Sequence, residues 1–195
     1  MNIDHSDLAR HWTLDPDVVF LNHGSFGACP RPVMDAQQRL RVRLERQPVQ
    51  FFVRDYESLM TEARSAMAGF VGAATQDLVF VANATTAVNA VLRSLPFHPG
   101  DELLTTNHEY NACRNALEFV ADRAGAVTTV VEIPFPVAGP DEVVARLLER
   151  VTERTKIALI DHVTSQTGLV LPIAQIVREL AERGVDTLVD GAHAP

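Results

Sequence analysis

The sequence predicts an α/β fold in which a mostly parallel β-sheet is flanked by helices. From residue 78 onward, short apolar runs alternate with amphipathic helical patterns, as is typical of crossover units around a parallel sheet. The chain has 195 residues, 47% of them hydrophobic, so it can bury a sizeable core. The expected strands lie at residues 78–81, 102–105, 127–131, 157–160 and 187–189, and the expected helices at residues 86–95, 111–124, 141–151 and 173–183.

The first part of the chain has a less regular pattern. Residues 1–77 are predicted to form an N-terminal segment of helices and one strand, ahead of a domain that spans residues 78–195. The expected elements of this segment are a helical lead-in at residues 6–12, a strand at 18–21 that ends in a glycine-punctuated turn, an amphipathic helix opened by Pro30 and Pro32, and a second helix at 56–70.

Composition excludes several classes of protein. The formal net charge of -8 argues against general binding to nucleic acid or anionic membranes, because both need clustered basic residues. No apolar run approaches the roughly 20 residues of a membrane-spanning helix. Cys29 and Cys113 are far apart, and the N-terminus has no apolar core of the signal-peptide type. We therefore expect a cytoplasmic protein with reduced thiols.

Polar and aromatic side chains follow four of the predicted strands. Ligands of parallel sheets bind outside the carboxyl ends of the strands, so these segments are the candidate site. They cover residues 82–86, 107–111, 161–166 and 190–193.

The segment around Thr85 and Thr86 is a candidate anion cradle. It opens a predicted helix, where free backbone amides and the positive end of the helix dipole favour a bound phosphate. The alternative is ordinary N-capping by Asn83, Thr85 or Thr86.

Two further side chains could contact a flat, positively charged ligand. Asp190 closes an apolar strand, where a carboxylate is costly to bury unless a cation or several donors meet it. A helix cap or an ion pair would explain Asp190 equally well. Tyr110 could stack on a ring, or it could be a half-buried aromatic residue with a hydrated hydroxyl.

Other chemistries lack their sequence patterns. The chain has neither the glycine-rich turn of a dinucleotide site nor that of a P-loop, and nothing local would activate either cysteine as a nucleophile. No metal is predicted, because the candidate ligands lack a known metal-binding spacing. Those candidates are His23, His108, His162, His193, Asp161 and Asp190.

Four short segments are informative when they are taken together and in order. They read LNHGSFG at residues 21–27, NATTAVN at 83–89, NHEYNA at 107–112 and DGAHAP at 190–195. Together they resemble the class V aminotransferases, fold-type I enzymes that use pyridoxal 5′-phosphate (PLP), and look most similar to the isopenicillin N epimerase-like branch. The resemblance implies a truncated large domain of the aspartate aminotransferase-like type.

The resemblance also implies roles for single residues. Thr85 and Thr86 would hold the cofactor phosphate, and Tyr110 would stack on its ring, where desulfurases usually have histidine. Asp190 would pair with the pyridine nitrogen and keep it protonated, so that the ring accepts electrons from the α carbon of the substrate.

The remaining implied residues surround the other edge of the cofactor. His193 and Ser165 would lie near its phenolic oxygen, where relatives commonly have glutamine and asparagine. Asn22 and His23 would lie near the substrate. The departures at Tyr110, His193 and Ser165 weaken a desulfurase assignment more than the PLP assignment.

The family also requires a lysine that holds PLP as a Schiff base, and this lysine is expected beyond Pro195. Lys156 is the only lysine of the chain and is expected at the strand end opposite the ligand. The resemblance therefore implies a fragment of a homodimeric PLP-dependent epimerase. The alternatives are a cysteine desulfurase or carbon–sulfur lyase, and a non-catalytic truncated subunit.

Overall fold

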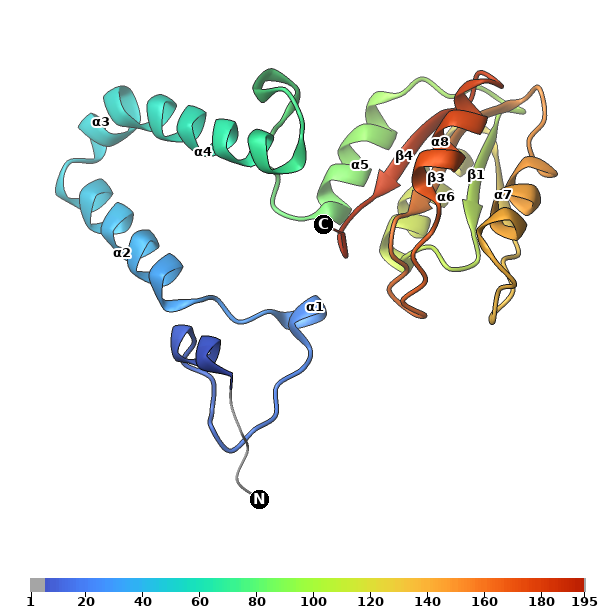
Figure 1. Cartoon of the computed structure of the whole chain (residues 1–195). Helices are drawn as coiled ribbons and strands as arrows, with labels where there is room; N and C mark the ends of the chain where they lie inside the picture. Colours follow the sequence, from blue (N-terminus) through green and yellow to red (C-terminus); the bar gives the residue numbers. More distant parts are fainter. Residues whose placement is uncertain (1–5, 195) are drawn as a thin grey trace. The chain divides into compact units, whose positions relative to one another are not determined.

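The computed structural model describes residues 6–194, so residues 1–5 and Pro195, the last residue of the DGAHAP segment, lie outside the described part. The chain divides into two compact units, Met1–Val79 and Phe80–Pro195 (Figure 1). The predicted division fell between residues 77 and 78.

The first unit is helical. Among its described residues only Phe51 and Ala68 are buried, so its amphipathic helices have no extensive core of their own within the unit. Its elements are the 3-10 helix Asp7–His11, α1 (His23–Phe26), α2 (Arg31–Arg46), α3 (Pro48–Gln50), the π-helical turn Phe51–Asp55, α4 (Tyr56–Val71) and the 3-10 turn Thr75–Asp77.

The strand predicted at residues 18–21 is wrong. Among the described residues, no strand pairs with this run, and Val18, Val19 and Leu21 are exposed. An extended segment becomes a strand only when a neighbour accepts its backbone hydrogen bonds. Apolar character alone therefore did not suffice here.

The second unit contains a four-stranded, fully parallel sheet with the strand order β2-β1-β3-β4 (Figure 1). Helices connect successive strands, as the alternating pattern predicts. The strand order reverses between β1 and β3: β2 is added on one side of β1, and β3 and β4 are added on the other. The elements are α5 (Ala84–Ser94), β1 (Glu102–Thr106), α6 (Asn111–Ala124), β2 (Val127–Val131), α7 (Pro140–Leu148), β3 (Thr155–Asp161), α8 (Ile173–Ala181) and β4 (Asp186–Asp190).

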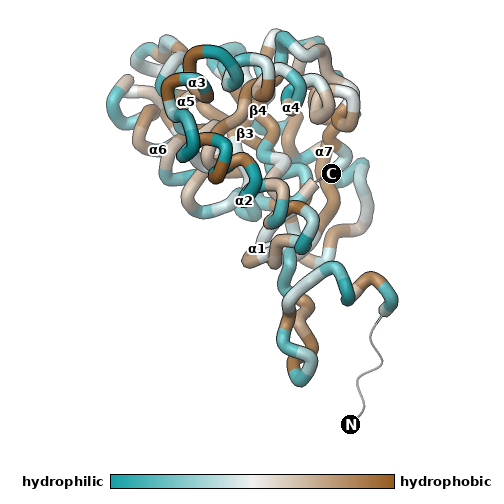
Figure 2. Tube along the Cα trace, turned by 90° about the vertical axis from the view of Figure 1, so that its left-hand side faces the viewer, coloured by the Kyte–Doolittle hydropathy of each residue, from teal (hydrophilic) through white to brown (hydrophobic). Residues whose placement is uncertain are grey.

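Two apolar clusters sandwich this sheet. Ile157 and Leu159 of β3 lie in the cluster formed with α5 and α6. Ala158 and Ile160, which alternate with them, lie in the cluster formed with α7 and α8. Every residue of β1 and every residue of β3 except Lys156 is buried, as expected for strands buried on both faces, and apolar stretches lie near the label of β3 in Figure 2. The α/β fold with helices on both sides of a parallel sheet is therefore confirmed.

Local sequence explains the ends of the helices that matter for the site. The side chain of Asn83 caps α5 by accepting a hydrogen bond from the amide of Thr86 at 2.8 Å. Helix α6 ends at Gly125, whose φ of 69° lies in the left-handed region that glycine adopts without strain.

The strand predicted at residues 78–81 is also wrong. These residues have no strand partner in the part of the chain that is described, and Val79, Phe80 and Val81 are exposed. The other four predicted strands and the four predicted helices of this unit form at the predicted places to within a few residues. No helix in residues 6–194 combines the length and apolarity needed to cross a membrane.

Candidate functional site

Strand alternation directs two acidic side chains to the same face of the sheet. Asp161 ends β3 and Asp190 ends β4, and the two residues are register partners across this parallel pair. Leu159 and Leu188, two residues earlier on each strand, pack in the cluster with α5 and α6. Because side chains two residues apart share a face, both carboxylates point toward the side that α5 and α6 cover.

Asp190 is 4% exposed and accepts two hydrogen bonds. Its Oδ1 accepts from the backbone amide of Ala192 at 3.0 Å, and its Oδ2 accepts from the thiol of Cys113 at 3.1 Å. Among residues 6–194, no Lys, Arg or His forms an ion pair with it. A buried carboxylate without a protein cation suits a cationic ligand.

Thr85 lies within reach of the same thiol. The Thr85 hydroxyl is 4.0 Å from the Cys113 sulfur, in the first turn of α5. Thr86 is exposed, and its amide is occupied by the Asn83 cap, so the predicted capping alternative holds for this amide. The backbone amides of Ala84 and Thr85 come before the first backbone hydrogen bonds of α5, so they lie free at the positive end of the helix dipole.

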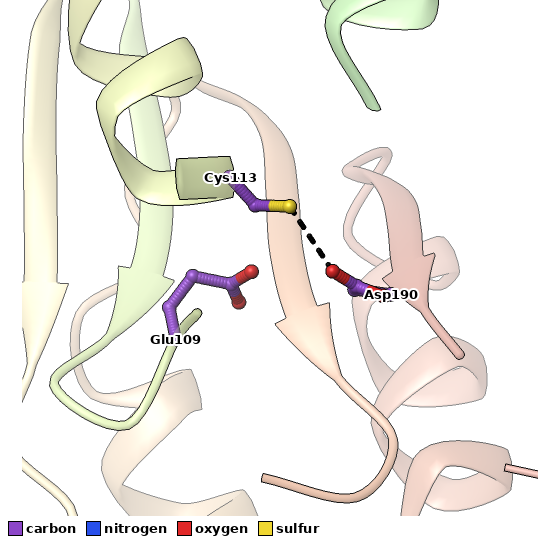
Figure 3. Close-up of side chains that lie close together, drawn as sticks. All are labelled: Glu109, Cys113 and Asp190. Atoms are coloured by element: carbon purple, nitrogen blue, oxygen red, sulfur yellow. Dashed lines mark hydrogen bonds between the residues drawn. The ribbon is translucent and has the colours of Figure 1, made fainter. Parts of the chain in front are cut away.

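Glu109 is a third acidic group at this site, and our sequence analysis assigned it no role. It follows β1, is 2% exposed, and neither carboxylate oxygen has a hydrogen-bond partner. In Figure 3 its carboxyl group points toward Cys113 and Asp190. One potential ligand atom from each of these three residues lies within 4.8 Å of the others. An acid three residues after the end of a buried strand was the available sequence signal.

Burial and repulsion between neighbouring carboxylates favour the protonated forms of Glu109 and Asp161. Burial, followed by the charges of Asp161 and Asp190, raises the pKa of Glu109 to about 9. Looser contacts with the Asp161 backbone and the Thr105 hydroxyl, which do not reach hydrogen-bond geometry, oppose this rise. Burial and the charge of Asp190 raise the pKa of Asp161 to about 7. Three adjacent buried acids therefore cannot all be anionic at neutral pH.

Cys113 lies at the centre of this site as a neutral thiol. Burial raises its pKa to about 12, and its hydrogen bond to Asp190 acts in the same direction. It is therefore a donor to Asp190 rather than a nucleophile. Glu109, Cys113 and Asp190 could also ligate a metal ion by distance, an arrangement that no ligand spacing in the sequence indicates.

Three other predicted cofactor residues lie in loops at the carboxyl edge of the sheet. Tyr110 caps the start of α6 and is 43% exposed. Ser165 is an exposed residue of the turn after β3, and His193 is exposed in the turn after β4. They come from the same edge as Asp161 and Asp190. No side-chain hydrogen bond involving these three residues occurs within the described chain.

The two predicted substrate residues belong to the first unit. Asn22 precedes α1, and the ring of His23 contacts those of Phe20 and Trp12, with centroids 4.7 and 6.3 Å away. These rings line part of a cavity of about 530 Å³. The roles of Asn22 and His23 near a substrate stay predictions.

The ring of His108 forms hydrogen bonds that link two loops of the site. Its ring nitrogens lie 3.0 Å from the Thr167 hydroxyl and 2.9 Å from the Ile133 carbonyl oxygen. Thr167 in turn lies 2.7 Å from the hydroxyl of Thr164. Because a carbonyl only accepts, Nε2 carries a proton. This network connects the loop that carries Glu109 and Tyr110 to the loop that carries Ser165.

Lys156 is remote from these groups. It is the second residue of β3, half exposed, with its amine 4.0 Å from Asp101. Asp161 lies five residues further along the strand, about 16 Å at the usual rise per residue. Lys156 thus lies at the amino end of the strand, where it cannot serve Asp190.

Curated proteins are similar to this chain in sequence. The chain is 41% identical to an isopenicillin N epimerase of Amycolatopsis lactamdurans over 94% of its length, and that stretch is 46% of the relative. It is 33% identical to a probable chloroplastic L-cysteine desulfhydrase of Arabidopsis thaliana over 96% of its length and 42% of the relative. The chain thus spans about half the length of the curated relatives it matches.

Solved structures agree on the fold. A complex of the cystine C–S lyase C-DES with cysteine persulfide superimposes with a TM-score of 0.83 and 25% identity, over 89% of this chain and 47% of the other. A mutant of C-DES with glycine linked to its PLP cofactor superimposes with a TM-score of 0.81 at 24% identity, over 89% of this chain and 46% of that one. The sequence pattern of the aminotransferase class-V family matches residues 26–194. The chain belongs to the aminotransferase class-V family.

Proposed function

We propose that this chain contributes a PLP-binding half-site to an enzyme that acts at the α carbon of an amino acid or short peptide, in the manner of an isopenicillin N epimerase. The observation that carries the proposal is the shared contact of Thr85 and Asp190 with one side chain, Cys113. An anion-binding helix start and a buried carboxylate are thereby close enough for one small aromatic phosphate to reach both.

The residues present fit such a ligand. Asp190 is buried and has no protein cation among the described residues, so a protonated pyridine nitrogen would supply the missing positive charge. Thr85 and the first amides of α5 would hold the phosphate. Tyr110, at the start of α6, would cover one face of the ring.

Each of these residues would have a limited task. When bound, PLP supplies an electron-accepting ring that stabilises negative charge at the α carbon of an amino acid. Asp190 would hold the proton on the ring nitrogen. Ser165 and His193 would lie near the phenolic oxygen, and Asn22 and His23 near the substrate. The lysine that retains the cofactor covalently would come from beyond Pro195.

The matches at 41% and 37% identity support an epimerase. The desulfhydrase match favours a second candidate, carbon–sulfur bond cleavage. The protein that includes the expected lysine distinguishes them: exchange of the α hydrogen with deuterium without release of sulfide supports the epimerase, and sulfide release from cysteine supports the lyase. A homodimer and a cytoplasmic location are part of the proposal, on the resemblance and the composition alone.

Binding of pyridoxamine 5′-phosphate to the 195-residue chain tests the half-site directly. This analogue has no aldehyde, so it cannot react with Lys156. We expect saturable binding by calorimetry, weakened at least about thirtyfold by Asp190→Asn, because a buried charge pair is lost. Equal affinity of Asp190→Asn and the unsubstituted chain would exclude the assigned role of Asp190.

A further inference from the structure

We propose that Cys113 and Glu109 are positioning residues for Asp190: the thiol orients one carboxylate oxygen, and Glu109, as a neutral acid, leaves Asp190 as the anion that meets the ring nitrogen. The inference rests on the proposed function, since Asp190 has this task only in a PLP site. Neither residue was predicted from the sequence to take part in cofactor binding.

Two hydrogen bonds fix the orientation of the Asp190 carboxylate. Its Oδ1 is held by the amide of Ala192 and its Oδ2 by the thiol of Cys113. Cys113 is completely buried in the cluster between α5, α6 and the sheet, so its side chain cannot rotate freely. The carboxylate of Asp190 is therefore held from two sides before any ligand arrives, which reduces the entropy lost on binding.

Hydrogen-bond donors decide which of the two neighbouring acids, Glu109 or Asp190, carries a proton. Asp190 has two donors that stabilise its anionic form, whereas both oxygens of Glu109 lack any donor. Two anions this close in a buried site repel each other strongly. The unassisted group takes up the proton, and the assisted group keeps the charge.

The groups that face Glu109 reinforce this distribution. They are Cys113 from α6, Asp161 from β3 and Asp190 from β4, and none of them is basic. His108, its neighbour in sequence, directs both ring nitrogens to Thr167 and Ile133 instead. The acid at position 109 therefore has no counter-ion among the described residues and acts as a neutral spacer beside Asp190.

Isosteric amides separate the two acids experimentally. Pyridoxamine 5′-phosphate is titrated into the unsubstituted chain, Glu109→Gln and Asp190→Asn by calorimetry near neutral pH. We expect Glu109→Gln to bind within about threefold of the unsubstituted chain, since the amide is also neutral, and Asp190→Asn to bind at least about thirtyfold more weakly. A loss at Glu109→Gln as large as that at Asp190→Asn would overturn the neutral role of Glu109.

The thiol is tested by removal and rescue. Cys113→Ala should weaken binding about fivefold, because one donor to Asp190 is lost, and Cys113→Ser should restore most of it with a hydroxyl donor. Cys29→Ala is the matched control at the exposed cysteine. Equal affinities of Cys113→Ala, Cys113→Ser and the control would overturn the orienting role.

A spectroscopic readout needs no ligand. The infrared S–H stretching band of Cys113, identified by its loss in Cys113→Ala, should move to higher frequency in Asp190→Asn, because the amide is a weaker acceptor than the carboxylate. An unmoved band would contradict the hydrogen bond even if the cofactor failed to bind. Absence of binding by the unsubstituted chain, together with a shifted band, would instead refute the proposed function and leave the thiol contact intact.

The alternative to the positioning role is that Glu109, Cys113 and Asp190 bind a metal ion. Stoichiometric retention of Zn²⁺ by the unsubstituted chain, lost in both Cys113→Ala and Glu109→Gln, would overturn the positioning role. Affinity for pyridoxamine 5′-phosphate that is unchanged by EDTA supports it.

Discussion

Asp161 and Asp190 end two adjacent parallel strands as direct register partners, and their side chains share one face of the sheet. Both are buried, and Glu109 adds a third acid beside them. An unpaired acidic group of this kind costs free energy in the ligand-free protein. This cost is expected of a site that is organised for a cationic ligand rather than for stability.

The stability of the ligand-free chain should fall as the pH rises. The pKa of Glu109 in the folded protein is about 9, above the ordinary value of 4.5 for a glutamate side chain, and the pKa of Asp161 is raised as well. Between the ordinary and the raised pKa of each acid, the folded chain retains a proton that the unfolded chain has lost. Each pH unit in that range therefore lowers the free energy of unfolding by up to about 1.4 kcal/mol per proton. Urea unfolding from about pH 5 to about pH 9 measures this slope.

Glu109→Gln should flatten that dependence in the upper half of the range, since the amide does not titrate. Glu182→Gln, at the exposed end of α8, removes the same charge from the surface and should leave the slope unchanged. If Glu109→Gln and the unsubstituted chain lose stability in parallel, Glu109 is not the group that retains the proton.

Only one of the two thiols should react with Ellman's reagent in the folded chain. Cys29 is exposed, whereas Cys113 is buried with a pKa raised to about 12, so it supplies almost no thiolate at mildly alkaline pH. In denaturant both should react. Two equally fast thiols in the folded chain would show that Cys113 is accessible and would contradict its contact with Asp190.

Thr85→Val should weaken binding of pyridoxamine 5′-phosphate by about five- to tenfold, because a hydroxyl donor to the phosphate is lost while the side-chain volume is kept. Pyridoxamine, which has no phosphate, should bind both chains equally. Thr128→Val, on β2 at the opposite edge of the sheet from Asp190, is the control. Equal losses for the two ligands would remove Thr85 from the phosphate site.

His108→Ala should lower the free energy of unfolding by about 2 kcal/mol, because it leaves the Ile133 carbonyl and the Thr167 hydroxyl without their ring partner. His98→Ala alters an exposed histidine and should change stability by less than about 0.5 kcal/mol. Urea unfolding measures both values. Similar small changes would mean that the His108 network does not hold the two loops together.

Periodicity predicted the four strands of the sheet because short apolar runs alternate with amphipathic helices in this part of the chain. Residues 127–131 and 157–160 are short apolar runs between amphipathic helices, and both became strands. Runs 18–21 and 78–81 carry the same signal but have no strand partner among the described residues. Hydropathy indicates that a segment prefers burial, whereas pairing depends on residues far away in the sequence.

The candidate site was predictable in part. Asp190, Thr85 and Tyr110 could be selected because they follow strands or start helices, and such positions converge at one edge of a parallel sheet. Glu109 received no role, and Cys113 was weighed only as a nucleophile, because the contacts that involve them join residues up to 77 positions apart. Proximity of that kind has no local signature.

Local sequence alone determined the alternation of strands and helices from β1 to β4, the helix ends at Asn83 and Gly125, and the four segments that resemble the class V family. These depend on propensity, capping and periodicity over short stretches. Only the tertiary structure decided which acids share a pocket, which one keeps its proton, and which donors hold Asp190. Electrostatic and hydrogen-bond energies depend on distance in space, and the parallel sheet sets those distances by bringing β1, β3 and β4 together.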